Sequence, residues 1–166
     1  MIDFAPLLTA APVIQLHVAA ATIAILLAPI NLLRRRWDRL HRTLGYVWVT
    51  AMATCALSSF WISGIRMLGP FSPIHLLSLL TFYALWTGLR FARRGQIEAH
   101  RASFRGLTFY GLTGAGGFAF LPGRLMNEVF FQETPAMGYL VLALVGVAAV
   151  LHISLGGVRR KLRTQR

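Results

Sequence analysis

The basic residues of this chain fall into three blocks, and long uncharged apolar runs separate the blocks. Fifteen of the seventeen lysines and arginines lie in these blocks, five in each. A helix needs roughly 20 apolar residues to cross about 30 Å of hydrocarbon, and the sequence holds about five such runs. Only helices and closed barrels satisfy their backbone hydrogen bonds in lipid. The pattern therefore predicts an all-α, polytopic membrane helical bundle.

The predicted bundle is a single transmembrane domain over residues 1–166. Its helices are expected at about 11–33, 43–63, 74–89, 106–121 and 138–157. With five spans, all three basic blocks lie on one side, which the positive-inside rule makes cytoplasmic. The N-terminus is then outside and the C-terminus cytoplasmic. Asp3 and the lack of a basic leader argue against a cleaved signal peptide.

The net charge of +12 is also typical of nucleic-acid-binding proteins. The position of the charge argues against that function, because the blocks stand where helices leave the membrane. Such blocks control topology and contact anionic lipid headgroups. We expect the partners to be the lipid bilayer and anionic lipids on the cytoplasmic face, and we expect no nucleic acid.

The five histidines fall at two depths in the predicted bundle. His17 lies roughly 24 Å from the inner end of its helix, and His75 lies roughly 27 Å from Arg93, so both belong to an outer layer. His41 and His100 open helices on the cytoplasmic side and share an inner layer. His152 belongs to the inner half.

Two histidine pairs on different helices are the ligands that a bundle needs for two bis-histidine haems. We therefore predict an integral membrane b-type haem protein with one or two haem b groups, moving electrons across or within the membrane. The candidate iron ligands are His17 and His75 for an outer haem, and His41 and His100 for an inner haem. Arg42 and Arg101 are candidate partners of the haem propionates, because guanidinium matches carboxylate geometry. A quinol is a candidate electron donor.

Two other interpretations stay open. Histidines near the interface could cap helices or meet headgroups, and a histidine inside a span could face the interior without binding metal. The alternative function is a non-catalytic accessory or assembly subunit of a larger respiratory or photosynthetic membrane complex. Small size and the glycine-rich run at 106–121 suggest it, because small residues make close helix contacts. A small transporter is less favoured, since neither charged spans nor two related halves stand out.

Common catalytic signatures are missing from the sequence. There is no Walker loop, dinucleotide-binding glycine motif, H-E-x-x-H or paired C-x-x-C. Asp3 and Asp38 are the only aspartates, which argues against a Ser-His-Asp triad. Whether the protein is an enzyme stays open. Arg124 and Glu128, in the outer connection, are candidates for a substrate or quinol site above the outer histidines.

Three motifs resemble those of a known family. They are His41-Arg42-x-x-Gly45 followed by Tyr46, Pro73-Ile74-His75-Leu76, and Arg93-Arg94-Gly95-x-Ile97-x-Ala99-His100-Arg101. They resemble a family of bacterial integral membrane proteins catalogued as a domain of unknown function, over about residues 13 to 125. The family usually continues the last motif with Trp-Met-Arg, whereas this chain has Ala102-Ser103-Phe104-Arg105.

The resemblance implies a multi-pass helical bundle in the bacterial inner membrane. More loosely, the chain is similar to di-haem cytochrome and ferric-reductase-like bundles, which use histidines on successive helices. That second step is an analogy of architecture and a weaker argument for function.

Overall fold

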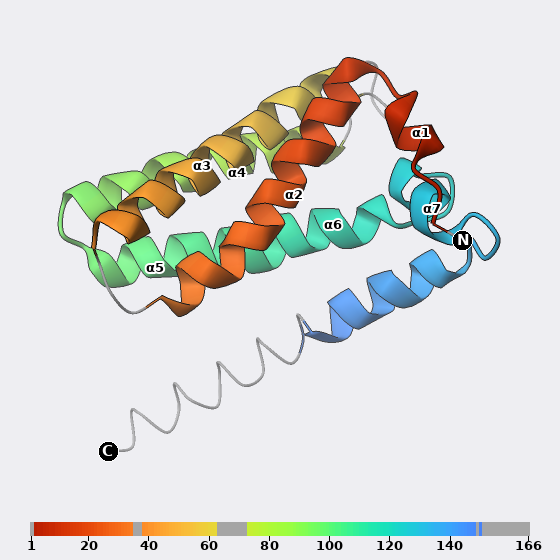
Figure 1. The fold of residues 1–166 in the computed structure, drawn as a ribbon. Coiled ribbons are helices and arrows are strands. Elements are labelled where there is room, and N and C mark those ends of the chain that lie inside the picture. Colours follow the sequence, from red (N-terminus) through yellow and green to blue (C-terminus); the bar gives the residue numbers. More distant parts are fainter. Residues whose placement is uncertain (1, 35–37, 63–72, 149, 151–166) are drawn as a thin grey trace. The chain divides into compact units, whose positions relative to one another are not determined.

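The structure is a computed structural model of the 166-residue chain, and it describes residues 2–34, 38–62, 73–148 and 150. These residues form helices joined by turns, and none of them lies in a strand. The helices are α1 (Ala5–Leu8), α2 (Pro12–Leu33), α3 (Arg39–Ser58), the 3-10 helix η1 (Ser59–Trp61), α4 (Pro73–Arg93), α5 (Ile97–Gly106), the π-helix η2 (Leu107–Leu112), α6 (Thr113–Ala119), α7 (Leu125–Phe131), and a last apolar helix over Met137–Ala148 (Figure 1). The predicted all-helical class is confirmed.

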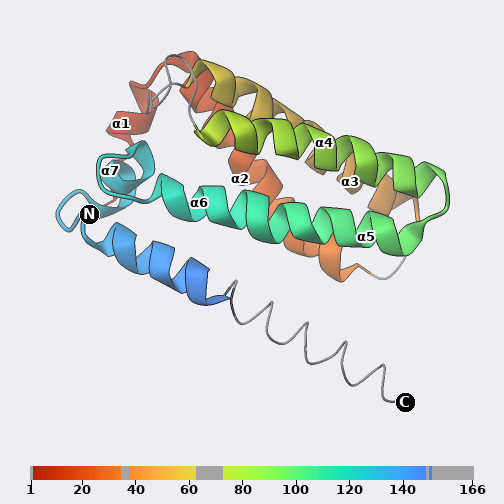
Figure 2. The same cartoon turned by 180° about the vertical axis from the view of Figure 1, so that it is seen from behind.

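The contacts along the chain divide it into two compact units. One unit is Leu7–Leu112, and the other combines Met1–Pro6 with Thr113–Arg166. In the first unit α3 lies between α2 and α4, and α5 runs beside α4, as Figures 1 and 2 both show. η2 closes this arrangement by contacting both α2 and α4. The single domain predicted over residues 1–166 stays a prediction.

Two helices in the described part are long and apolar enough to cross a membrane. They are Pro12–Leu33 and Arg39–Trp61, and they match the first two predicted spans. The 22 residues of α2 rise about 33 Å at 1.5 Å per residue, enough for the hydrocarbon layer. The last predicted span runs beyond residue 150 into residues outside the described part, so the count of five and the orientation stay predictions.

α2 packs on α3 through small side chains. Ala20, Ala24 and Ala28 recur every fourth residue and are its buried positions, whereas large apolar side chains such as Leu26 and Leu33 are exposed. Helices in lipid associate through close packing of small residues, because lipid tails are as apolar as leucine. Trp48 of α3 is buried in this interface and donates its Nε1–H to the carbonyl oxygen of Ala24 at 3.0 Å.

α3 begins at Arg39, four residues before the predicted start at Thr43. Asp38 caps the helix, since its carboxylate accepts the backbone N–H of His41 at 3.0 Å. Aspartate at this position satisfies a backbone donor that the helix leaves unpaired. The cap therefore places His41 inside the first turn of α3, before the predicted start of the span.

α4 continues to Arg93, four residues beyond the predicted end at Leu89. Gly95, at φ +71°, ends it in a Schellman motif: Gln96 N–H donates to Phe91 O at 2.9 Å, and Gly95 N–H to Ala92 O at 3.1 Å. Glycine takes this left-handed conformation at no steric cost. The sequence Arg93-Arg94-Gly95 at the start of the third motif is thus a helix stop.

α5 begins at Ile97, nine residues before the predicted start of the fourth span. Residues 97–105, which lie between the third and fourth predicted spans, are therefore helical, and the helical turns continue through η2 into α6. No proline or glycine interrupts the sequence between Gln96 and Arg105, which explains the earlier start. Isolated π turns such as η2 are frequent at functional sites.

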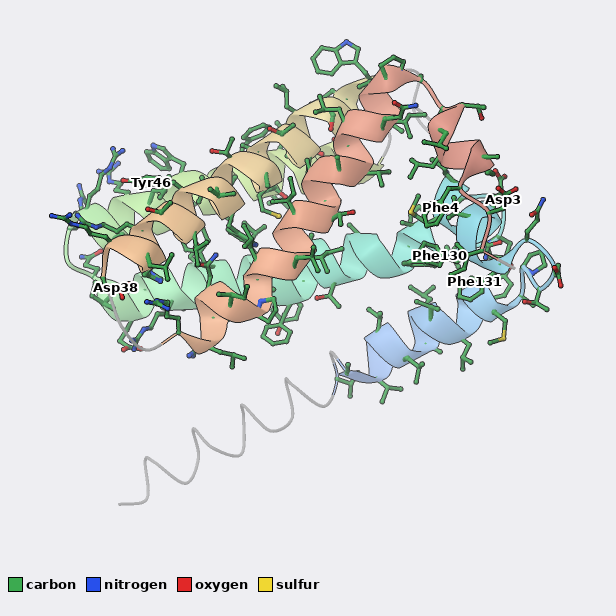
Figure 3. All side chains as sticks on the ribbon, in the orientation of Figure 1. Asp3, Phe4, Asp38, Tyr46, Phe130 and Phe131 are labelled. Carbon is green, nitrogen blue, oxygen red and sulfur yellow. The ribbon has the colours of Figure 1, made fainter. Side chains whose placement is uncertain are left out.

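The unit around α7 is organised by one buried amide. Asn127 donates its Nδ2 to Phe120 O at 2.7 Å and to Pro135 O at 2.9 Å, joining the segments before and after α7. The backbone N–H of Asp3 donates to Val129 O at 3.0 Å, which holds the N-terminal residues beside α7 (Figure 3). This connection, predicted only as a long outer segment, is an ordered turn around a short helix.

Candidate cofactor-binding site

A cavity of about 1080 Å³ lies inside the unit Leu7–Leu112. Residues from α2, α3, α4, α5 and η2 line it. They include His41, His100, Asn31 and Thr108, the apolar Ala28, Val49, Leu89 and Ile97, the aromatic Tyr46, Trp48 and Phe104, and the basic Arg34, Arg42, Arg93, Arg101 and Arg105. Cofactor pockets are typically about 300–1,000 Å³, mostly apolar, with a few polar groups. This cavity has the size and the mixture of a cofactor pocket.

His100 reaches the cavity from α5 with one ring nitrogen already bonded. Its Nδ1 lies 2.9 Å from the carbonyl oxygen of Gly88 on α4. A carbonyl oxygen only accepts, so Nδ1 carries the hydrogen, and in a neutral imidazole Nε2 keeps its lone pair. The ring meets Phe104 edge to face, with centroids 4.8 Å apart. His100 is therefore held in the form in which histidine ligates a metal.

His41 reaches the same cavity from the first turn of α3. Its Nδ1 is buried and has no hydrogen-bond partner among the described residues. A buried polar atom without a partner costs roughly 1–3 kcal/mol, so this nitrogen is an unsatisfied group beside the cavity. The structure thus brings together the two histidines that the sequence placed in an inner layer.

The charge around the cavity is strongly positive. Five arginines line it, and no carboxylate lies among its described lining residues. Arg101 contacts Glu98 at 3.2 Å, but Glu98 is mostly exposed, so water weakens that pair. Arg42 is exposed at the mouth. An anionic group on a ligand would be attracted to this mouth.

Asp38 keeps one of these arginines in place. Arg34 donates to its carboxylate from Nη2 and, at 3.3 Å, from Nε. These hydrogen bonds, with a further one from the backbone N–H of His41, lower the pKa of Asp38 to about 2. Asp38 is therefore ionised at physiological pH, both as the cap of α3 and as the partner of Arg34.

The outer histidines lie in a different setting. His17 of α2 contacts α3, with its Nδ1 2.9 Å from Ser58 Oγ and its Nε2 3.5 Å from Cys55 Sγ. His75 of α4 is buried and stacks on Phe60, with centroids 5.3 Å apart and an interplanar angle of 6°. Both contact the chain at the end of α3. His152 lies outside the described residues.

Several residues of the cavity were not predicted from the sequence. Trp48 and Phe104 pack edge to face, with centroids 5.4 Å apart. Asn31 donates to Leu44 O at 3.3 Å, while its Oδ1 is buried without a hydrogen-bond partner among the described residues. An asparagine within an apolar run was the available signal, because a polar side chain in lipid should face the interior.

No group of three or more His, Cys, Asp or Glu side chains that could hold a metal ion occurs in the described ranges. Haem iron takes only its axial ligands from the protein. A pair of histidines is therefore the motif to examine, and the cavity contains one.

Arg124 and Glu128 lie in the unit around α7. The guanidinium of Arg124 lies over the ring of Phe118, 4.9 Å from its centroid. Glu128 is in the first turn of α7, which follows Arg124 directly. Their predicted place above the outer histidines stays a prediction, because the contacts given for them lie within their own unit.

Comparison with known proteins gives one match. A family model described as "Predicted membrane protein (DUF2306)" matches residues 14–154. No curated protein and no solved structure matches the chain. The matched stretch covers most of the chain and contains both His41-Arg42 and His100-Arg101. The chain therefore belongs to this family of membrane proteins of unknown function.

Proposed function

We propose that the protein binds a b-type haem in the cavity between α3, α4 and α5, where the imidazoles of His41 and His100 would hold it, and that it carries electrons within the membrane. The observation that carries the proposal is the pair of imidazoles in one cavity. His100 has an Nε2 lone pair, and His41 lines the same cavity from α3.

The other lining residues suit the same group. Arg42 and Arg101 at the mouth would bind the propionates, because guanidinium and carboxylate form paired charge-assisted hydrogen bonds. Trp48, Phe104 and Leu89 supply apolar surface that would pack on a flat macrocycle and exclude water. A bound haem would supply a one-electron couple whose potential depends on its ligands and on burial.

The chain's own residues would set that potential. The Gly88 carbonyl, accepting from Nδ1 of His100, increases the electron density of the ligating imidazole. The arginines act in the opposite direction, because positive charge favours the reduced state of a site. Apolar packing by Trp48 and Phe104 lowers the local dielectric and strengthens both effects.

A second, outer haem at His17 and His75 is part of the same proposal. Both residues are on the helices that the sequence predicted, and His17 already faces α3. Haem content distinguishes a protein with one haem from a protein with two, because the two give different ratios of haem to protein. A quinol as electron donor, and the bacterial inner membrane as location with anionic lipids at the basic blocks, complete the proposal.

The test is an absorption spectrum of the purified protein after expression with added haem. We expect a Soret band and sharp reduced α and β bands, as for low-spin bis-histidine haem. His100→Ala and His41→Ala should each remove the inner signal. The matched control is Thr22→Ala, which removes only a local bond from Oγ1 to Val18 O. A folded wild-type protein without haem absorbance would reject the proposal.

The alternative proposal is an accessory or assembly subunit of a larger membrane complex. The observation that favours it is the last helix, whose Leu140, Leu144 and Val147 are exposed, because an apolar helix face can cover a neighbouring subunit. Native electrophoresis of solubilised membranes separates the two functions. Migration alone with haem supports the electron carrier, whereas co-migration with a larger assembly without haem supports the subunit.

A further inference from the structure

We propose that Gly88 on α4 is a positioning residue that fixes His100 as the Nδ1–H tautomer, so that the cavity receives a ligating Nε2. Nothing in the family description assigns a role to this glycine. The inference concerns the protonation of the imidazole itself, and it rests on the proposed function only for the identity of the group that Nε2 binds.

The first observation is the close approach of α5 to α4 at this position. A Cβ added to Gly88 would lie 2.7 Å from Cε2 of Phe104 and 3.0 Å from its Cζ. Real Cβ atoms essentially never approach a neighbour to 2.7 Å, and the neighbour here is a ring packed between Trp48 and His100. The absence of a side chain at Gly88 is what lets α5 lie this close.

The second observation is that two side chains of α5 donate to carbonyl oxygens of α4. His100 Nδ1 lies 2.9 Å from Gly88 O, and Ser103 Oγ donates to Ala84 O at 3.1 Å. Ala84 and Gly88 are four residues apart, one helical turn, so both carbonyls belong to one face. A carbonyl oxygen has two lone pairs and can accept a side-chain donor in addition to its helical partner.

Together these observations determine the chemistry of the ring. Without the close approach, Nδ1 would lose the acceptor that holds its hydrogen, and the proton would distribute between both nitrogens. With the acceptor present, Nε2 is the basic nitrogen. It can bind a Lewis acid such as haem iron, or accept a hydrogen bond, but it cannot donate one while the ring is neutral. Gly88 thus selects the class of ligand.

The experiment uses the full chain, free of haem, with ¹⁵N-labelled histidine rings in detergent or nanodiscs. Only five histidines occur in the chain, and His100→Gln identifies the signal of His100. We expect a protonated Nδ1 and an unprotonated Nε2 for His100 in the wild type, and averaged tautomers in Gly88→Ala. Gly106→Ala is the matched control, because an added Cβ there meets nothing within 4 Å.

A rescue variant keeps the test informative if Gly88→Ala is too unstable. In Gly88→Ala/Phe104→Leu the ring that the methyl group meets is gone, and we expect the Nδ1–H tautomer to return. A wild-type His100 that carries its proton on Nε2 would overturn the proposal. So would a folded Gly88→Ala protein with an unchanged tautomer.

A second readout uses haem. Loss of an outer-shell hydrogen bond to a ligating histidine typically reduces metal affinity by about 10- to 100-fold, and we expect a loss of that size in Gly88→Ala but not in Gly106→Ala. If no variant and no wild type binds haem, the proposed function fails while the tautomer measurement still decides the role of Gly88. Haem affinity unchanged in Gly88→Ala would count against the positioning role.

Discussion

The two histidine pairs of this chain differ in what surrounds them. The inner pair, His41 and His100, lines a cavity with arginines at its mouth, and Nδ1 of His100 lies against the carbonyl oxygen of Gly88. The outer pair, His17 and His75, is embedded against side chains at the end of α3: a thiol and a hydroxyl for His17, and a phenyl ring for His75.

The difference shows that depth in the membrane and readiness to bind are separate properties. Both pairs are predicted at depths that suit haem ligation, but in the structure a cavity accompanies the inner pair. Hydroxyl-rich packing accompanies the outer pair, where Ser59 and Ser78 also bond to each other. Buried polar groups with good partners are costly to disturb. The inner pair is therefore the stronger candidate.

The largest expected effect separates the pairs directly. His100→Ala should reduce the haem bound at the inner site by at least about tenfold, because an axial ligand and its support are lost together. His17→Ala should leave the inner signal unchanged. Haem content per chain, measured with the reduced spectrum, checks both. If His17→Ala lost all haem absorbance although His41 and His100 are intact, the outer pair would be the stronger candidate.

Trp48→Phe tests the support of the inner site. The change removes the hydrogen bond to Ala24 O of α2 and alters the ring contact with Phe104 of α5. We expect unfolding to become easier by roughly 1–3 kcal/mol and the inner haem to bind more weakly. Denaturant titration in detergent measures the first effect. Trp61→Phe, at an exposed position, is the control and should change neither.

Gly95→Ala tests the turn that leads to His100. Its φ of +71° disfavours a residue with a Cβ by about 1–2 kcal/mol. We expect a loss of stability of that size and a smaller loss of inner haem. Gly114→Ala, where an added Cβ meets nothing within 4 Å, serves as the control and should be neutral or stabilising. Equal effects of both substitutions would show that the turn is not special.

Ser58→Ala tests the surroundings of the outer histidine pair. It removes the hydroxyl that contacts Nδ1 of His17, at a cost of about 1 kcal/mol. The inner site should be unaffected. The measurements are the free energy of unfolding and the inner haem content, and a loss of inner haem in this variant would show that the two layers are coupled.

The smallest expected effect is the pH dependence of the α3 cap. The pKa of Asp38 is lowered to about 2 in the folded protein, against about 3.9 for an ordinary aspartate. Its ionised form therefore favours the folded state. That contribution is complete above the unfolded pKa and is lost as pH falls through the folded one.

We expect the melting temperature of the wild type to change little on this account above roughly pH 5 and to drop toward pH 2. Asp38→Asn can still cap the helix but cannot titrate, so the difference in melting temperature between the two proteins should shrink as pH falls. A difference that is constant across the acid range would contradict the role assigned to the carboxylate.

The structure brings His41 and His100, which the sequence predicts at one level, into one cavity, whereas the lateral arrangement of the helices was predicted poorly. Charge blocks and the rise of a helix placed His41 and His100 at one level, since both quantities run along the helix axis. Which faces of the helices meet depends on packing around the axis. α2 is apolar over most of its surface, so its periodicity alone does not select the stripe at Ala20, Ala24 and Ala28. The contact of Gly88 with Phe104 could not be predicted for the same reason.

Helix ends were missed where the signal was short. Asp38 three residues before His41 is a cap signal, and Gly95 after two arginines is a stop signal. Both lie between the predicted spans, because blocks of arginine dominate those stretches and end the apolar runs. The structure of the segment around Asn127 could not be predicted from a periodic pattern, because the hydrogen bonds of one buried amide hold this segment together.

The position of Trp48 has a practical consequence for anyone studying this protein. Of the tryptophans in the described part of the chain, Trp48 is buried and lines the cavity, whereas Trp61 and Trp86 are exposed. Its fluorescence should therefore report on the contents of the cavity, and a coloured ligand placed there should quench it by energy transfer. The difference in emission between the wild type and Trp48→Phe would isolate the signal of Trp48. This signal would provide a binding assay that needs no knowledge of the ligand.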